Sequence, residues 1–366
     1  MSWRIIKSSK KSSARAGTLS TRHGRFATPA FMPVATRGAV KSLSAEELHQ
    51  VGSQIILANT YHLWQRPGLS IIKKAGGLHN FMNWDRPILT DSGGYQVYSL
   101  AKLRKITEQG VSFVSEIDGT KLMLTPEKAI DIQQVLGSDI MMVLDECPPY
   151  PSTVKYARNS MALTTRWAKR SLNYKKKKRI SQQLLFGIVQ GSVYKSLRQA
   201  HAAELSQLNF DGYALGGLAV GEPTNIMYRV LDFTVPILPF DKPRYLMGTG
   251  KPDQIVEAVK RGIDMFDCVI PTRHARHGTI YIWKSNKPQG NFFDELRIKQ
   301  SKFSKDLKPL DKRCGCQTCT NYSRAYLRHL FMSGDPLGSR LASLHNVYFY
   351  LELMAKLRVL IKSGKI

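Results

Sequence analysis

The chain has 366 residues and a formal net charge of +27, from 54 lysines and arginines against 27 aspartates and glutamates. This length can bury a large core, either as one large α/β domain with an appendage or as two domains. The charge favours a polyanionic partner over a small acidic metabolite, although a lysine-rich proteome would give the same excess. We interpret the basic run Lys175–Arg179 only as a solvated loop.

Apolar segments and cysteines bear on the compartment. No apolar stretch approaches the roughly 20 residues that cross a bilayer, and the N-terminus lacks a signal-type apolar region. Three of the five cysteines crowd into residues 314–319, which suits metal binding in a reducing compartment better than disulfides. We therefore expect a cytoplasmic protein with no membrane partner.

Short apolar runs recur along the first 270 residues, and most lack polar alternation, as expected of parallel strands buried on both faces. Helical patterns lie between them, with start signals such as the Ser44/Glu47 capping box, Pro126 and Pro252, and with Ser192 before another. Eight strands alternating with helices predict a (β/α)8 TIM barrel, with a doubly wound sheet as the alternative. The predicted strands are Ala30–Ala35, Gln54–Asn59, Ile88–Asp91, Ile140–Asp145, Leu184–Gln190, Tyr213–Leu218, Arg244–Gly248 and Met265–Pro271.

Polar residues stand where these strands end. Asp91, Asp145 and Gln190 end the third, fourth and fifth strands, and the eighth strand carries Asp267. In a barrel these ends converge on one mouth, where glycines such as Gly217 let a ligand approach the backbone closely. Each aspartate could be a helix cap, but three at matching strand ends favour an active site.

Two arginines, Arg273 and Arg276, follow the eighth strand in what we expect to be a loop. Their guanidinium groups are suited to phosphate or guanine contacts. The alternative is a satisfied Asp267 followed by a solvated basic loop. The segment therefore suggests a nucleotide site without establishing one.

Cys314, Cys316 and Cys319 form a C-x-C-x2-C motif, whose thiolates can fold around one Zn²⁺ at about 2.3 Å. His329 and His345 are both candidates for the fourth ligand. Three thiolates and an imidazole leave no open position, so we expect one structural zinc per subunit. We predict a barrel over residues 1–290, with a β-hairpin insertion near 111–124, and a zinc-binding subdomain with a C-terminal helix over 291–366.

The whole chain resembles the bacterial-type tRNA-guanine transglycosylases, also called queuine tRNA-ribosyltransferases, of queuosine tRNA modification. That family has a (β/α)8 barrel with a zinc subdomain. It exchanges guanine at the tRNA wobble position for a 7-substituted deazaguanine without cleaving the phosphodiester chain. The motifs that carry the resemblance lie at 91–96 (DSGGYQ), 144–147 (LDEC), 187–191 (GIVQG), 216–222 (GGLAVGE), 247–250 (MGTG), 266–268 (FDC) and in the cysteine cluster.

The resemblance also implies roles for individual residues. Asp267 would be the nucleophile that attacks C1′ of the ribose, and Asp91 the general acid/base. Tyr95 and Met247 would sandwich the base, and His345 would be the fourth zinc ligand, which demotes His329. The implied base-binding residues are Ser92, Gly93, Gly94, Tyr95, Asp145, Gln190, Gly217, Leu218, Glu222 and Met247. The implied RNA-binding residues are Gly248, Thr249, Gly250, Lys251, Thr272, Arg273 and Arg276.

With Cys147 and Val220 at these positions, the chain resembles the family members that use the aminomethyl precursor preQ1. The resemblance also implies a homodimer that binds one tRNA at a time. His274 and His277 depart from many relatives. A non-catalytic tRNA-binding relative would lack the catalytic aspartates. This chain has both Asp91 and Asp267. A carbohydrate glycosidase would need an aromatic-rich cleft, and the glycine-rich strand ends with Arg273 and Arg276 fit a nucleotide better.

Overall fold

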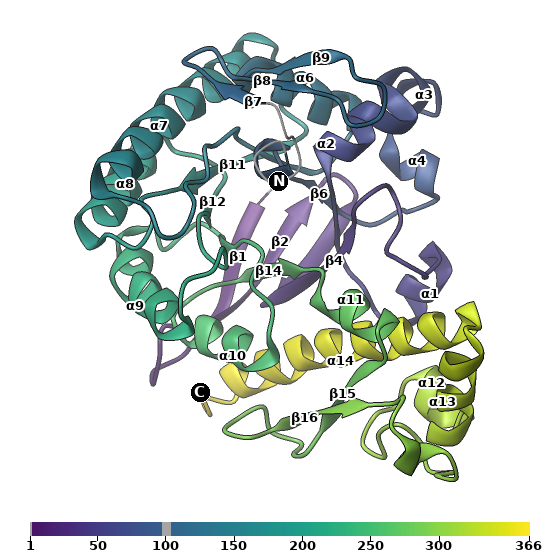
Figure 1. The fold of residues 1–366 in the computed structure, drawn as a ribbon. Coiled ribbons are helices and arrows are strands. Elements are labelled where there is room, and N and C mark those ends of the chain that lie inside the picture. Colours follow the sequence, from purple (N-terminus) through teal and green to yellow (C-terminus); the bar gives the residue numbers. More distant parts are fainter. Residues whose placement is uncertain (1, 97–103) are drawn as a thin grey trace.

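A computed structural model describes residues 2–96 and 104–366 (Figure 1). Eight strands form a closed parallel barrel, in which β14 pairs with β4 in register from Met265 opposite Ala30. The barrel confirms the predicted (β/α)8 fold, and the doubly wound alternative is wrong because the sheet has no edges. The barrel strands are β4 (Ala30–Ala35), β5 (Ile56–Ala58), β6 (Ile88–Thr90), β10 (Ile140–Met142), β11 (Leu184–Val189), β12 (Gly212–Leu215), β13 (Arg244–Leu246) and β14 (Met265–Cys268).

Helices surround the barrel, and several begin at the predicted signals. The Ser44 hydroxyl accepts the Glu47 N–H while the Glu47 carboxylate accepts the Ser44 N–H, which completes the capping box. Pro126 and Pro252 each take a first-turn position. The surrounding helices are α1 (Ala45–Gln50), α2 (Thr60–Leu63), η1 (Trp64–Gly68), α3 (Leu69–Lys74), α4 (Leu78–Met82), α6 (Pro126–Leu136), α7 (Val154–Lys177), α8 (Lys195–Ser206), α9 (Thr224–Thr234), η2 (Val235–Ile237), α10 (Pro252–Lys260) and α11 (Ile270–Arg276).

Two segments predicted as loops are helical in whole or in part: the prediction is wrong for Lys175 to Lys177 and for the arginines after β14, while Lys178 and Arg179 form an exposed turn. Lys175 to Lys177 form the last turn of α7, where lysines interact favourably with the helix carbonyls, and Lys175 also lies 3.4 Å from Asp211. Arg273 and Arg276 lie on α11, because Pro271 stands in the first turn of a helix, a place that proline tolerates.

Residues 2–28 form an antiparallel sheet that the sequence pattern did not reveal, with strands β1 (Ser2–Ser8), β2 (Arg15–Thr21) and β3 (Gly24–Thr28). Arg15 pairs with Asp264, and the His23 N–H donates to Asp139. These two aspartates lie directly before β14 and β10. The small sheet therefore covers the amino-terminal mouth of the barrel.

Two antiparallel units accompany the barrel. After β6, strands β7 (Arg104–Ile106), β8 (Val111–Val114) and β9 (Lys121–Leu124) form a three-stranded sheet, in which β8 and β9 make a hairpin. After α11, β15 (Thr279–Trp283) pairs with β16 (Phe293–Arg297) across the predicted boundary at 290, and the division of the chain there stays a prediction.

The C-terminal helix α14 (Pro336–Lys362) runs beside α10 and α11 (Figure 1, yellow). Its Asn346 amide donates to the Pro271 carbonyl, and its Tyr350 hydroxyl donates to the Gly250 carbonyl. The helix therefore supports the segments that follow β13 and β14. The remaining elements are η3 (Ser301–Phe303), α12 (Gln317–Asn321) and α13 (Arg324–Ser333). Among the described helices, none is long and apolar enough to cross a bilayer.

Candidate active site

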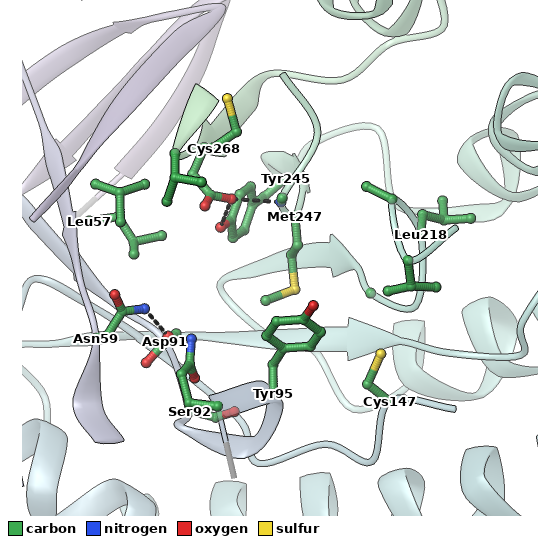
Figure 2. A pocket seen from close by; sticks show the side chains of 18 of the residues that line it. Leu57, Asn59, Asp91, Ser92, Tyr95, Cys147, Leu218, Tyr245, Met247 and Cys268 are labelled. Atoms are coloured by element: carbon green, nitrogen blue, oxygen red, sulfur yellow. Dashed lines mark hydrogen bonds between the residues drawn. The ribbon is translucent and has the colours of Figure 1, made fainter. Parts of the chain in front are cut away.

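A cavity of about 380 Å³ opens at the carboxyl ends of the barrel strands (Figure 2). Asp91, Asp145 and Asp267 all line it. They come from the ends of β6, β10 and β14, which are far apart in the sequence. The barrel thus gathers the three predicted aspartates into one site, as expected where strand ends converge.

Asp267 stands on β14 and has two uncharged donors. Its Oδ1 accepts the Tyr245 hydroxyl at 2.6 Å and the Gly248 N–H at 2.8 Å. Burial raises the pKa of Asp267, and these two hydrogen bonds oppose the rise because they stabilise the carboxylate. The arrangement fixes the orientation of this carboxylate inside the cavity.

Asp91 follows β6 and is 8% exposed. It accepts a hydrogen bond from the Asn59 amide (Figure 2) and another, at 2.8 Å, from the Thr60 N–H. Burial raises the pKa of Asp91 to about 6, these donors oppose the rise, and the negative charge of Asp267 adds to it. A carboxyl group with such a pKa can release and take up a proton near neutral pH.

Asp145 and Gln190 are joined directly. The Gln190 amide donates to Asp145 Oδ2 at 2.7 Å, and the Ser92 hydroxyl lies 3.4 Å from Oδ1. Burial raises the pKa of Asp145 to about 6, against these hydrogen bonds. Gln190 keeps a buried amide oxygen without a hydrogen-bond partner in the described residues. Asp145 lines the cavity and offers its carboxylate to a ligand with N–H groups, whereas Gln190 is fully buried outside the lining and orients Asp145.

Two glycines after β12 allow the backbone to approach Gln190. A Cβ on Gly217, which has φ +63°, would lie 2.4 Å from the Gln190 amide oxygen, and one on Gly216 would lie 2.6 Å from its nitrogen. The buried Arg198 guanidinium donates to the Gly216 carbonyl at 2.8 Å. Only glycine fits these positions, so they form a close backbone wall for a flat ligand.

Other predicted base-binding residues complete this wall. Tyr95, Met247 and Leu218 line the cavity, and Figure 2 shows the Met247 side chain pointing toward the Tyr95 ring. Glu222 lies outside the lining and accepts the N–H groups of Ala219 at 2.6 Å and Val220 at 3.0 Å. It thereby holds the segment that follows Leu218. Gly93 and Gly94 are buried and do not belong to the lining; Gly93 lies in a bend after Asp91 and Gly94 begins a helical segment.

The predicted RNA-binding residues differ in how exposed they are. Gly248 lines the cavity, whereas Thr249 and Thr272 are buried, and Gly250 is packed so closely that a Cβ would meet the Cys268 sulfur. The exposed cations of the set are Lys251 and Arg273. Arg276 is half-buried, and its Nη1 has no hydrogen-bond acceptor among the described residues.

The C-terminal region holds a separate group of metal-ligand side chains. The sulfurs of Cys314, Cys316 and Cys319 lie 3.7, 3.4 and 3.2 Å from His345 Nδ1. His345 Nε2 lies 2.7 Å from the Tyr281 carbonyl, which fixes the proton on Nε2 and leaves Nδ1 free to bind a metal. All four residues are buried, while the other candidate, His329, is exposed on α13. The donors fit a closed tetrahedral metal site.

Two residues beside the aspartates were not identified from the sequence. Asn59, which directly follows β5, could have been found by applying the strand-end rule to the second strand. Tyr245 lies within β13, where an aromatic residue is expected to be part of the hydrophobic core, so no sequence signal set it apart. Both also line the cavity.

Comparison with known proteins agrees with this geometry. Residues 9–366 match the model of the family described as queuine tRNA-ribosyltransferase. Proteins of that name are similar to the chain over nearly their whole length. That of Staphylococcus haemolyticus is 55% identical over 361 residues, covering 99% of this chain and 92% of its own. That of Bacillus subtilis is 52% identical over 364 residues, covering 100% and 93%. The chain therefore belongs to the queuine tRNA-ribosyltransferase family, and it is a pentosyltransferase.

Proposed function

We propose that the chain exchanges guanine at the wobble position of tRNA for the queuosine precursor preQ1, through a covalent intermediate on Asp267. The observation that carries this proposal is the meeting of three carboxylates in one cavity, each held by uncharged donors among the described residues. Family membership supplies the class of reaction. The geometry supports a division of labour among the three aspartates.

The proposed reaction has two displacements. Asp267 forms a bond to C1′ of the ribose while the bond from C1′ to guanine N9 breaks, and the departing base takes a proton from Asp91. The incoming base then loses its N9 proton to Asp91 and displaces Asp267 from C1′. Two displacements retain the configuration at C1′, as in retaining glycosidases. The raised pKa of Asp91, about 6, suits this exchange of a proton.

We propose that Asp145 and Gln190 read the edge of the base. A carboxylate can accept both the N1–H and N2–H₂ groups of guanine or a deazaguanine. The backbone of Gly217 and Leu218 would bind next to them, and Tyr95 and Met247 would enclose the ring. Cys147 and Val220 also line the cavity, which supports preQ1 as the incoming base.

The RNA would lie across the segments that follow β13 and β14. The exposed Lys251 and Arg273, with the half-buried Arg276, supply positive charge on these segments, where the anticodon loop must enter with its target base splayed out. We also propose that two copies of the chain form a dimer that holds one tRNA. Sedimentation at micromolar concentration would contradict the dimer if a fully active monomer were found.

Zinc is the metal we propose for Cys314, Cys316, Cys319 and His345. With no open coordination position it would supply folding energy rather than chemistry. Cys316→Ser should lose the metal and melt at a lower temperature. Full zinc occupancy with unchanged melting in this variant would contradict the assignment.

Exchange of radiolabelled guanine into undermodified tRNA tests the central proposal. The protein should incorporate the label, and added preQ1 should release it without cleavage of the RNA chain. Incorporation should require no nucleotide cofactor. A protein that binds tRNA but never exchanges its guanine would be the non-catalytic relative instead.

A further inference from the structure

A second group of metal-ligand side chains lies at the amino-terminal mouth of the barrel, opposite the active site. His23, His79 and Asp139 each offer one ligand atom, and these atoms lie within 4.8 Å of one another. His23 stands in the turn between β2 and β3, His79 on α4, and Asp139 directly before β10. Tertiary folding alone brings them together, since they are distant in the sequence.

The separations of the donor atoms fit a single ion. His23 Nδ1 lies 3.0 Å from Asp139 Oδ1, and His79 Nε2 lies 3.3 Å from Oδ2. The two imidazole rings stack with their centroids 3.6 Å apart. Ligands bound at about 2.1 Å to a tetrahedral or octahedral ion stand roughly 3.0–3.4 Å apart, which matches both His–Asp separations. To share the ion, the two imidazole rings would turn out of their stack.

His79 and Asp139 are buried, and both keep atoms that could bind an ion. The Asp139 carboxylate accepts the backbone N–H groups of His23 and Ile88, both at 2.9 Å, which holds it in place. His79 is only 9% exposed, and its Nε2 faces Asp139 Oδ2 at 3.3 Å. A bound ion would replace this long His79–Asp139 contact with direct coordination of both atoms.

We propose that His23, His79 and Asp139 bind a divalent transition-metal ion of the zinc class, with water completing the coordination. Two imidazoles and a carboxylate are ligands that Zn²⁺, Co²⁺ and Ni²⁺ accept. The His23 side chain is 26% exposed, which gives the ion a route from solvent. The site is separate from the cysteine cluster, and its ion fastens the amino-terminal sheet to the barrel.

Equilibrium dialysis of tag-free protein with its cysteine site filled by zinc tests this proposal. The protein is dialysed against Co²⁺, and both metals are measured by elemental analysis. Wild type should gain one cobalt per chain while keeping its zinc. His23→Gln should bind the added cobalt at least about tenfold more weakly. His329→Gln, which alters an exposed histidine on α13, serves as the control and should match wild type.

His23→Gln should fold, because the backbone N–H of residue 23 still reaches Asp139. Thermal melting gives a second measurement, since an ion that binds only the folded chain raises Tm. Added Co²⁺ should raise the Tm of wild type and of His329→Gln, but not that of His23→Gln. The proposal is overturned if wild type gains no further cobalt, or if His23→Gln gains it with unchanged affinity.

Discussion

At the amino-terminal end of the barrel buried Asp264 is paired with buried Arg15, whereas the aspartates at the carboxyl end have uncharged partners. The Arg15 guanidinium meets Asp264 through Nε at 3.0 Å and Nη2 at 2.6 Å. Asp91 and Asp267 are held instead by amide, hydroxyl and backbone donors. Neither forms a salt bridge with a described lysine or arginine.

The same residue type thus serves stability at one end and reactivity at the other. Burial raises the pKa of Asp264 too, but the facing Arg15 charge opposes that rise. In the cavity no described lysine or arginine pairs with Asp91 or Asp145, so burial raises the pKa of each to about 6. Unpaired buried carboxylates cost stability and are typical of active sites.

Asp267→Asn should give the largest effect on activity. It removes the nucleophile while keeping the shape of the side chain, so base exchange should fall by at least about 10³-fold. Affinity for tRNA should stay within a few-fold of wild type. Denaturing gels should show a covalent tRNA adduct for wild type only, and an adduct that persists in the variant would refute the assignment.

Asp264→Asn should affect stability instead. It leaves the Arg15 guanidinium buried without its carboxylate, and breaking a buried pair costs about 3–5 kcal/mol in the free energy of unfolding. Urea denaturation measures this loss, and the folded fraction should still exchange guanine. Asp232→Asn is the control, because Asp232 pairs with Arg261 at the surface and should change stability by about 1 kcal/mol or less. If the two variants were equally stable, the claim that the buried Asp264–Arg15 pair stabilises the fold would be contradicted.

Asp145→Ala should leave the donors on the base edge unpaired in a buried site. The expected cost is about 2–4 kcal/mol in transition-state stabilisation, or roughly 30- to 1000-fold in kcat/KM for guanine. tRNA binding should change little. Intact guanine exchange in this variant would mean that the base is read elsewhere in the cavity.

Asp91 should make stability depend on pH. Its carboxyl group has a pKa of about 6 in the folded chain and near 3.8 in the unfolded chain, so the folded state binds the proton more tightly. The free energy of unfolding is therefore highest, as far as this group contributes, below about pH 4, and it falls as the pH rises through 6. Asp91→Asn should remove that loss, amounting to up to about 3 kcal/mol at pH 7.5. Melting at pH 5 and pH 7.5 should show the gain at the higher pH, together with loss of exchange.

The sequence predicted the barrel because its buried strands are short apolar runs, and each run ended close to a residue of the site. It did not predict the amino-terminal sheet, whose β1 pattern of exposed and half-buried residues carries no buried face. The helix at Arg273 was missed because Pro271 ends strands and begins helices equally well. Tyr245 and Arg15 act through partners that only the closed barrel brings near, so their roles could not be derived from local sequence.

Arg276→Ala should give the smallest effect, and it separates RNA affinity from base chemistry. Burial and the neighbouring Arg273 charge lower the pKa of Arg276. A phosphate group placed beside these two arginines would therefore be bound favourably. Its loss should raise KM for tRNA a few-fold and reduce the slope of log affinity against log salt concentration by about 1, with kcat nearly unchanged. Lys176→Ala removes one charge from the exposed end of α7 and is the control. If both variants show the same salt slope as wild type, the RNA does not lie over α11.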